Sequence, residues 1–215
     1  MIYLIGGAPH CGKSTLATKL ARRLHISSVA TDTMESVVIR LYTKPWEIQK
    51  YFPKTWIRRQ ARTKMSNDVL FGKTSPRVVA RALIRQSRAI WDAIGVFVDC
   101  EVQAGRDIIV EGYHVHPRLV SAMRKKYGKK NVRAVFLTRH DREKIVHSCS
   151  LHPTQGNDWF TQKSGARTKV ESIGSMVVLF SQFLEKEARR YRCRIIATDL
   201  QYKKGIRDAL NSLAK

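Results

Sequence analysis

Residues 7–14 of the chain read Gly7-Ala8-Pro9-His10-Cys11-Gly12-Lys13-Ser14 and match the pattern G-x-x-x-x-G-K-[ST] at every fixed position. An apolar run of strand type, residues 2–5, precedes this stretch. Behind it, Leu16, Leu20 and Leu24 recur at every fourth position, as on one face of a helix. A glycine-rich loop between a strand and a helix can turn its backbone N–H groups toward phosphate oxygens, and the positive end of the helix dipole adds to the attraction. The stretch therefore predicts a phosphate-binding loop.

The same pattern indicates what each residue of the loop binds. We expect Lys13 to reach the β- and γ-phosphates of ATP and the hydroxyl of Ser14 to bind Mg²⁺. ATP and Mg²⁺ are thus the expected cofactors. The expected nucleotide-binding residues are Gly7, Ala8, Pro9, His10, Cys11, Gly12, Lys13, Ser14 and Thr15.

The rest of the chain alternates short apolar runs with helical patterns. The runs of strand type are residues 2–5, 27–31, 107–111, 132–138 and 193–198. Strands that alternate with helices form a parallel sheet through right-handed crossovers, and ligands bind beyond the carboxyl ends of the strands. We therefore predict the α/β fold class, with a doubly wound, mostly parallel five-stranded sheet in one domain over residues 1–215.

Residues 43–104 interrupt this alternation, and we interpret them as a helical insertion on the substrate side. Their first part, up to residue 75, reads as loops and short helices and mixes aromatic side chains with cations. The aromatic residues in and beside it are Tyr42, Trp46, Tyr51, Phe52 and Trp56. Stacking surfaces among cations suit the bases of single-stranded or flipped nucleotides. The alternative is that these aromatic side chains form the core of a small insertion.

From Ser75 to about Gln103 the pattern predicts one long helix, since Pro76 suits a first turn. Four arginines share one face of that helix, within an arc of about 80° at 100° per residue. They are Arg77, Arg81, Arg85 and Arg88. Such a row could follow a phosphate backbone. An exposed face that is merely solvated is the alternative.

Two carboxylates end strands of the predicted sheet. Glu111 follows a buried apolar run, where it could bind Mg²⁺ or hold a positioning water. Helix capping or a salt bridge is its alternative role. Asp32 lies near the expected γ-phosphate and could act as the base or orienting group for an acceptor hydroxyl. The alternative for Asp32 is an N-cap of a helix that starts near Met34. We assign Lys13, Asp32 and Glu111 to catalysis, and Ser14 and Glu111 to the metal.

Residues 149–169 form a polar, glycine-containing segment after the strand at 132–138, and we predict a lid there. Arg139 and Arg142 come between that strand and the lid. Arginines of a closing lid region neutralise charge on a transferring phosphoryl group, so we count both among the catalytic residues. The neighbouring His114 and His116 are interpreted as hydrogen-bonded loop histidines rather than catalytic groups.

The charge of the chain points to an anionic partner. Forty Lys and Arg residues face seventeen Asp and Glu residues, a net charge of +23 over 215 residues. A field of this size favours a polyanion, nucleic acid first, although a merely solubilising basic surface is the alternative. The four scattered cysteines give no zinc-ligand pattern and fit a reducing cytoplasm, or a host cytoplasm if the protein is viral. No apolar stretch is long enough to predict a membrane span.

Three pieces of the sequence resemble the P-loop kinases that are grouped with 2-phosphoglycerate kinase. They are the loop from Gly6 to Thr15, Glu111-Gly112-Tyr113-His114, and Phe136-Leu137-Thr138-Arg139 followed by Asn157-Asp158-Trp159. The similarity covers about residues 1–200. It implies the P-loop NTPase fold and ATP-dependent phosphorylation of a hydroxyl, with a carboxylate after the second strand and arginines in a lid. Phage kinases that phosphorylate 5-hydroxymethyluracil within DNA are P-loop kinases too, and their substrate is a polyanion.

Three functions therefore stay open from the sequence. The first is a kinase for a hydroxyl carried by nucleic acid, for instance 5-hydroxymethyluracil in viral DNA, which explains both the loop and the charge. The second is a kinase for a small anionic metabolite, similar to 2-phosphoglycerate kinase, in which the charge is incidental. The third is a nucleic-acid-binding P-loop ATPase without a transfer substrate. The sequence gives no indication of the oligomeric state.

Overall fold

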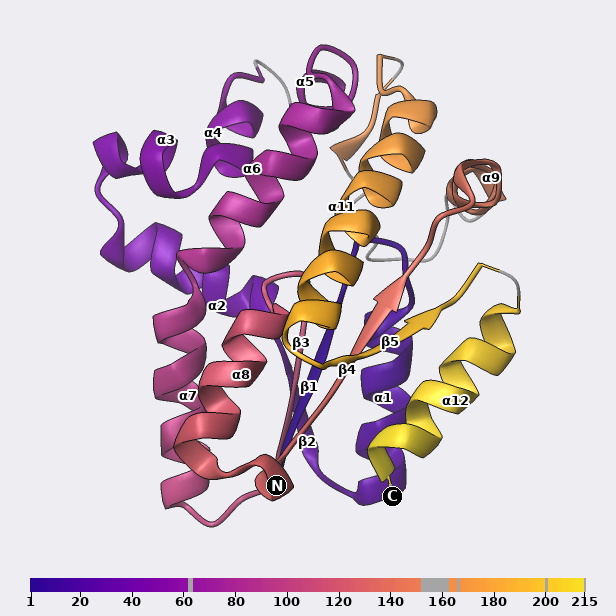
Figure 1. Cartoon of the computed structure of the whole chain (residues 1–215). Coiled ribbons are helices and arrows are strands. Elements are labelled where there is room, and N and C mark those ends of the chain that lie inside the picture. The colour runs from indigo at the N-terminus through magenta and orange to yellow at the C-terminus, as the bar shows by residue number, and fades with distance from the viewer. Residues whose placement is uncertain (62–63, 152–162, 166, 200, 215) are drawn as a thin grey trace.

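A five-stranded parallel sheet forms the centre of the molecule (Figure 1). The computed structural model describes residues 1–61, 64–151, 163–165, 167–199 and 201–214. The strands are β1 (Ile2–Gly7), β2 (Ser27–Ala30), β3 (Ile108–Glu111), β4 (Val132–Thr138) and β5 (Arg194–Ala197). Their order in the sheet is β2-β3-β1-β4-β5. All five predicted strands and the doubly wound α/β class are confirmed, with ends that differ by at most two residues from those expected.

The register of the sheet brings the ends of three strands to one edge. In the parallel pairing, Ile5 of β1 lies opposite Glu111 of β3, and Ala30 of β2 lies opposite the same Glu111. All residues of β1 and β3 are buried, as expected for strands that are covered on both faces. The segments that follow β1, β2 and β3 therefore all start at the carboxyl edge of the sheet, where ligands bind in this architecture.

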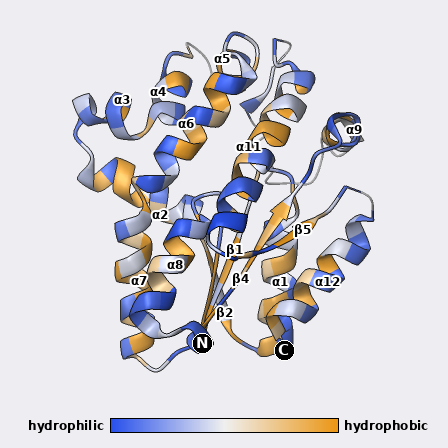
Figure 2. Ribbon diagram, viewed as in Figure 1, coloured by the Kyte–Doolittle hydropathy of each residue, from blue (hydrophilic) through white to orange (hydrophobic). Residues whose placement is uncertain are grey.

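Helices cover both faces of the sheet. Figure 1 shows α1 (Lys13–Leu24) and α12 (Tyr202–Ala214) on one side, and α8 (Pro117–Tyr127) and α11 (Val170–Arg190) on the other. The buried faces of these helices complete a core around the strands, and Figure 2 shows the apolar residues concentrated along the strands and on the inward helix faces. Helix α9 (Arg142–Leu151) follows β4 and packs against α11. No helix within the described residues is both long and apolar enough to cross a membrane.

The residues between β2 and β3 form a separate group of helices above the sheet edge. It begins with α2 (Thr31–Val37), a π-helical turn (Val38–Tyr42) and a 3₁₀ turn (Pro45–Glu47). The helices that follow are α3 (Ile48–Tyr51), α4 (Pro53–Arg59), α5 (Asn67–Leu70), α6 (Pro76–Arg88) and α7 (Trp91–Gln103). The prediction of one continuous helix from Ser75 to Gln103 is wrong, because the chain breaks into α6 and α7.

The break between α6 and α7 contains no glycine or proline. Near it, the Ser87 hydroxyl donates to the Ile84 carbonyl at 2.7 Å and also lies 2.9 Å from Nε2 of His116. The N–H of Ala89 then bonds to the carbonyl of Gln86, three residues back, and the helix ends. The start was predicted correctly, since Ser75 caps α6 through the N–H of Val78.

The aromatic side chains of this group are mostly exposed. Phe52 is buried, but Tyr42 is 77% exposed and Trp46 is 72% exposed. Tyr51 and Trp56 are also classed as exposed large hydrophobic residues. The alternative that they form the core of the insertion therefore holds for Phe52 and fails for the other four. All four arginines of the predicted row on α6 are exposed as well.

The predicted lid, residues 149–169, lies largely outside the described residues, which omit 152–162 and 166. Its first residues, 149–151, are the last turn of α9. Its last residues precede α11, and there Asp68 of α5 accepts from the N–H of Gly165 at 2.9 Å and from the Thr168 hydroxyl at 2.5 Å. This end of the segment is therefore fastened to the helical group above the sheet.

Candidate functional site

The loop between β1 and α1 has the backbone shape that its sequence predicts. Gly12 adopts a φ of 90°, in the left-handed region that favours glycine. A Cβ on Gly7 would lie 2.6 Å from the carbonyl oxygen of Leu137, so only glycine fits against β4 at that point. The ammonium group of Lys13 curls over the loop and donates to the carbonyl of Ala8 at 2.9 Å. The loop thus surrounds the start of α1, where its N–H groups and the helix dipole favour an anion.

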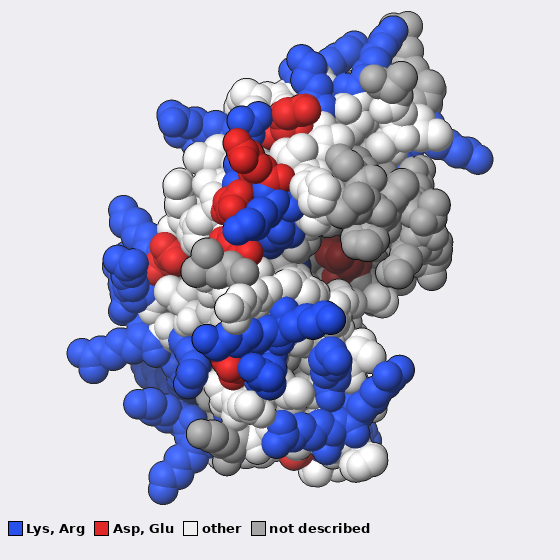
Figure 3. Space-filling model, turned by 90° about the vertical axis from the view of Figure 1, so that its right-hand side faces the viewer, with Lys and Arg blue, Asp and Glu red and all other residues white. Residues whose placement is uncertain are grey.

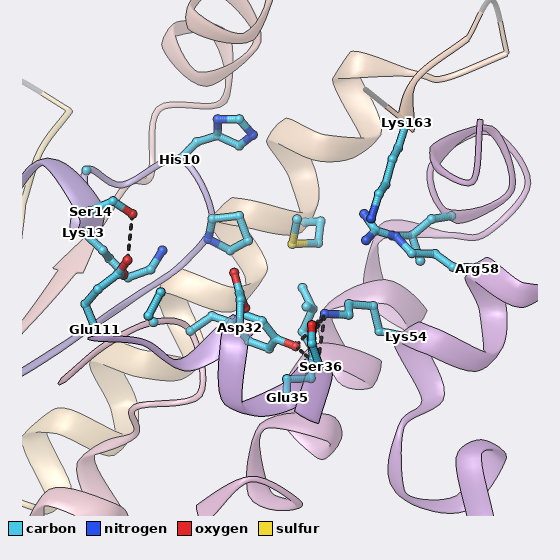
Figure 4. A pocket seen from close by; sticks show the side chains of 18 of the residues that line it. His10, Lys13, Ser14, Asp32, Glu35, Ser36, Lys54, Arg58, Glu111 and Lys163 are labelled. Carbon is cyan, nitrogen blue, oxygen red and sulfur yellow. Dashed lines mark hydrogen bonds and ion pairs between the residues drawn. The ribbon is translucent and has the colours of Figure 1, made fainter. Parts of the chain in front are cut away.

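Ser14 and Glu111 meet at the edge of the sheet. The Ser14 hydroxyl donates to Oε1 of Glu111 at 2.9 Å (Figure 4). Glu111 is only 8% exposed, so its carboxylate is held in place by the end of β3. A hydroxyl and a carboxylate are the kind of oxygen ligands that Mg²⁺ takes next to phosphates. The two residues predicted for the metal are therefore adjacent, and their chemistry fits Mg²⁺.

Asp32 faces the same cavity from the first turn of α2. The helix starts at Thr31 and its N-cap is Ala30, without a side-chain cap. The expected alternative role of Asp32, capping a helix that starts near Met34, is therefore not what the structure shows. Its side chain is 71% exposed, and Oδ1 lies 3.8 Å from Nδ1 of His114. Asp32 therefore presents an exposed carboxylate to the cavity, and its role as a base stays a prediction.

The two predicted arginines lie elsewhere, and among the described residues neither lines the cavity. Arg139 is buried behind the loop, where it donates to the carbonyl of His10 at 3.3 Å and to the Ser148 hydroxyl at 3.0 Å. Its Nε lies 3.5 Å from Asp199. Arg142 starts α9 and packs beside Gly174 of α11. Arg139 is thus placed to support the loop from behind, and a contact of either arginine with a phosphoryl group stays a prediction.

The cavity that these residues line has a volume of about 600 Å³. Its first wall is the phosphate-binding loop with Asp32 and Glu111. Its opposite wall comes from the helical group, the loop after β3, Lys163 and α11, and Figure 4 shows Lys163 reaching toward Arg58 on that wall. The further residues on the opposite wall are Glu35, Ser36, Lys54, Leu70, Phe71, Leu83, Tyr113 and Met176. The space therefore has room for a nucleotide phosphate and a second small molecule.

Glu35 is the centre of a buried polar cluster that the sequence analysis missed. Its carboxylate accepts from Nζ of Lys54 at 2.9 Å and from the Tyr113 hydroxyl at 2.6 Å. Nε2 of His114 lies 3.2 Å away, and the side-chain amide of Gln86 also donates to it. Burial alone would raise the pKa of Glu35, but the charge of Lys54 and the hydrogen bonds of His114 and Tyr113 hold it well below its usual range. The cluster joins α2, α4 and α6 to the loop after β3.

One sequence signal could have identified Glu35. It follows Asp32 by three residues, so the two share one face of a helix that begins at the sheet edge. Its partners Lys54, Gln86 and Tyr113 are 19, 51 and 78 residues away in the chain, and no local pattern connects them. The cluster is therefore a product of the tertiary fold.

Three cations of the opposite wall lie close enough to affect one another. They are Lys54, Arg58 and Lys163. Burial, together with the charges of Arg58 and Lys54, lowers the pKa of Lys163. Arg58 donates to Asn67 at 2.8 Å, and burial lowers its pKa as well. Among the described residues of this wall, these three cations face one carboxylate, Glu35, and such a balance of charge suits an anionic ligand.

Comparison with known proteins agrees with the fold. No family model matches the chain. A 2-phosphoglycerate kinase of Pyrococcus horikoshii is 31% identical over 121 residues, and that of Pyrococcus furiosus is 28% identical over the same length. Each match covers 56% of this chain and 37% of the relative, so the chain spans little more than a third of the curated relatives it matches.

Two solved structures have the same fold over nearly the whole chain. A gluconokinase from Sinorhizobium meliloti 1021 matches with a TM-score of 0.52 and 13% identity, covering 99% of this chain and 90% of that one. A sugar kinase from Janibacter sp. HTCC2649 matches with a TM-score of 0.50 and 17% identity, covering 99% and 94%. Together with the phosphate-binding loop, the arrangement of the sheet shows that the chain has the fold of the P-loop kinases.

We expect Glu35→Gln to lower the free energy of unfolding at pH 7 by about 3–5 kcal/mol, because it leaves Lys54 buried without a counter-charge. The native pKa of Glu35 lies below its unfolded value, so its contribution is present above the unfolded pKa and is lost as the pH falls. Below about pH 4.3, the free energy of unfolding should fall less steeply with decreasing pH in the variant than in the unmodified protein. The two slopes should differ by up to about 1.4 kcal/mol per pH unit. Urea unfolding between pH 3 and 7 measures both effects.

The exposed Asp92→Asn is the matched control, since it removes one carboxylate without disturbing a buried pair. An unchanged midpoint for Glu35→Gln at pH 7 would contradict the role of the cluster.

Proposed function

We propose that the protein is an ATP-dependent kinase that transfers the γ-phosphoryl group to a hydroxyl of a small anionic molecule. One observation carries the proposal: a single cavity is lined by Lys13, Ser14 and Glu111 on one wall and by the cationic side chains of Lys54, Arg58 and Lys163 on the other. The first wall suits the phosphates of ATP, and the second suits an acceptor with a negative charge. Asp32 lies on the same cavity and can contact the acceptor hydroxyl.

The residues of the first wall can stabilise the charge that develops during transfer. Lys13 is placed to move from the Ala8 carbonyl to the β- and γ-phosphate oxygens. Ser14 and Glu111 would hold Mg²⁺, which when bound neutralises charge on the phosphate oxygens. Arg139 and Asp199 keep the loop in shape from behind, because Arg139 donates to the His10 carbonyl. The loop is thus prepared for the nucleotide before it binds.

Asp32 can take the proton of the acceptor hydroxyl. Its carboxylate is exposed to the cavity and lies on the first turn of a helix whose next turn carries the buried Glu35. Because Glu35 and Thr31 hold the ring of His114, the backbone around Asp32 is anchored while its own side chain stays exposed. A carboxylate that orients the hydroxyl and accepts its proton is the expected base in phosphoryl transfer.

The small-molecule acceptor has more support than the nucleic-acid hydroxyl that the charge favours at the level of sequence. The curated relatives are named 2-phosphoglycerate kinase, and the similar solved structures are named gluconokinase and sugar kinase. A phosphorylated or carboxylated hydroxy compound would also complement the cations of the opposite wall.

The test is transfer of labelled γ-phosphate from ATP to a panel of hydroxy acids, phosphorylated hydroxy acids, sugars and oligonucleotides. We expect Mg²⁺-dependent labelling of an anionic small molecule. Lys13→Ala should reduce its rate by about 10²-fold or more, since Lys13 stabilises charge on the transferring group. Near-normal turnover by Lys13→Ala, or release of free phosphate alone with every acceptor, would contradict the proposal.

In the same assay, Asp32→Asn should lower kcat by about 10²-fold or more while ATP affinity changes little, because Asp32 acts on the acceptor hydroxyl. Steady-state kinetics and equilibrium titration of ATP separate the two quantities. Ser36→Ala, a neighbouring cavity residue without a proposed proton role, serves as the control. A loss of ATP affinity as large as the loss of kcat would assign Asp32 to the nucleotide instead.

A nucleic-acid acceptor, such as 5-hydroxymethyluracil in DNA, is the second candidate, and the surface charge favours it. On the face in Figure 3, Lys and Arg side chains gather along the left edge, in the lower half and at the top, and Asp and Glu lie mainly in the upper half. The row on α6 adds four exposed arginines, Arg77, Arg81, Arg85 and Arg88. Because phosphate contacts release counterions, such a surface binds nucleic acid in a salt-dependent way.

If each of the four arginines neutralises one phosphate, replacing all four with Gln should flatten the slope of log K against log salt by about 3.6 on duplex DNA. Fluorescence anisotropy of labelled duplexes between low and high salt measures the slope. Binding should weaken similarly across sequences, because phosphate contacts carry no base information. Absence of binding by the unmodified protein at about 0.1 M salt would remove this second candidate.

A further inference from the structure

A second cavity opens beside the first, on the outer side of the cationic wall. It has a volume of about 320 Å³. Five cations line it, which are Arg40, Lys54, Arg58, Arg59 and Lys163. Glu35 is the one carboxylate among the described residues around it. The remaining lining residues are Ser36, Ile39, Thr55 and Ser66.

The two cavities share a wall. Glu35, Ser36, Lys54, Arg58 and Lys163 line both of them. In Figure 4, Lys163 reaches down from above toward Arg58, with Lys54 and Glu35 below them, on the side of the cavity away from the phosphate-binding loop. A molecule that enters the first cavity and contacts these cations therefore has the second cavity directly behind them.

Among the described residues that line the second cavity, five cations face one carboxylate. Glu35 is already engaged by Lys54, Tyr113, His114 and Gln86. Within the described part of the chain, neither Arg40 nor Arg59 forms an ion pair. The lowered pKa of Lys163, caused by its burial and then by Arg58 and Lys54, shows that the positive charges at the shared wall act on one another. A second negative group placed here would relieve that repulsion.

The two outer arginines come from separate elements that meet at this cavity. Arg40 lies in the π-helical turn after α2, and Arg59 ends α4. Both side chains are exposed, so their guanidinium groups can reach a ligand that protrudes from the first cavity. Guanidinium groups present several N–H donors in a plane and are well suited to phosphate oxygens.

We propose that the second cavity is an anion subsite for an extended acceptor that carries two phosphate-type groups in series. This inference rests on the proposed kinase function. The inner anion contacts Arg58 and Lys163, and the outer anion contacts Arg40 and Arg59. The hydroxyl to be phosphorylated lies on the loop side of the inner anion, within reach of Asp32. Two sources share this chemistry, a small bisphosphorylated compound and a nucleic-acid strand.

The test measures binding by calorimetry with the phosphate-binding loop saturated by Mg²⁺ and a non-hydrolysable ATP analogue, so that the probes cannot occupy the loop. The probes are propyl phosphate and 1,3-propanediol bisphosphate. The bisphosphate should bind at least about tenfold tighter than the monophosphate, since it engages both subsites. In Arg40→Gln/Arg59→Gln this preference should fall below about threefold, whereas propyl phosphate should bind almost as before.

Arg22→Gln/Arg189→Gln is the matched control, because it removes the same charge from exposed positions that line neither cavity and lie outside the arginine row on α6. It should keep the preference. An equal loss in the control, an unchanged preference in Arg40→Gln/Arg59→Gln, or no preference in the unmodified protein would each overturn the subsite. A four-nucleotide thymidine strand in place of the bisphosphate separates the two sources. If a nucleic-acid strand is the ligand, its binding affinity should depend on Arg40 and Arg59 as that of the bisphosphate does; if a small bisphosphorylated compound is the ligand, it should not.

The result is separable from the kinase proposal. Phosphoryl transfer to compact acceptors, without tighter binding of the bisphosphate than of propyl phosphate, would contradict the subsite and support the kinase proposal. A bisphosphate preference that depends on Arg40 and Arg59, without phosphoryl transfer to any hydroxyl, would support the subsite and contradict the kinase proposal.

Discussion

The parallel register of three strands is the constraint on which the candidate site depends. Because Ile5 and Ala30 both lie opposite Glu111, the segments after β1, β2 and β3 begin at one level of one sheet edge. The loop then delivers Lys13 and Ser14, the second strand delivers Asp32, and the third ends in Glu111 itself. A shift of one residue in β3 would turn the Glu111 carboxylate to the other face of the sheet, away from Ser14. The buried apolar residues of the strands prevent such a shift, so the same core that stabilises the fold also sets the geometry of the site.

The second half of the site is held by helix packing and by one buried polar cluster. Helix α6 packs against α11 and adds Val79 and Leu83 to the core, and the Glu35 cluster ties the helical group to the sheet edge through Lys54, Gln86 and Tyr113. A buried ion pair costs desolvation, and it is tolerated when further hydrogen bonds satisfy both partners. Here the hydrogen bonds also place Lys54 at the wall of both cavities. The Glu35 cluster and the wall shared by the two cavities therefore have Glu35 and Lys54 in common.

The sequence was sufficient for the parts of the molecule that local patterns encode. The phosphate-binding loop, the five strands and the pairing of Ser14 with Glu111 follow from glycine spacing, apolar runs and the rule that parallel strands end at one edge. The prediction of one helix from Ser75 to Gln103 was wrong, and no glycine or proline marks the break at Ala89 and Ile90. Glu35, Lys54 and Lys163 were missed because they lie on separate segments of the chain that only the tertiary fold brings to one cavity. The large net charge indicated an anionic partner, and the cationic walls of the two cavities give that expectation a location.

The central claim is that the sheet edge forms a site for ATP and Mg²⁺ through Ser14 and Glu111. The most direct measurement is the affinity of a non-hydrolysable ATP analogue with and without Mg²⁺, for the unmodified protein and for Glu111→Ala. Mg²⁺ should strengthen binding to the unmodified protein, and Glu111→Ala should lose about tenfold or more of that gain while its metal-free affinity changes little. A Glu111→Ala protein that keeps the full effect of Mg²⁺ would contradict the account.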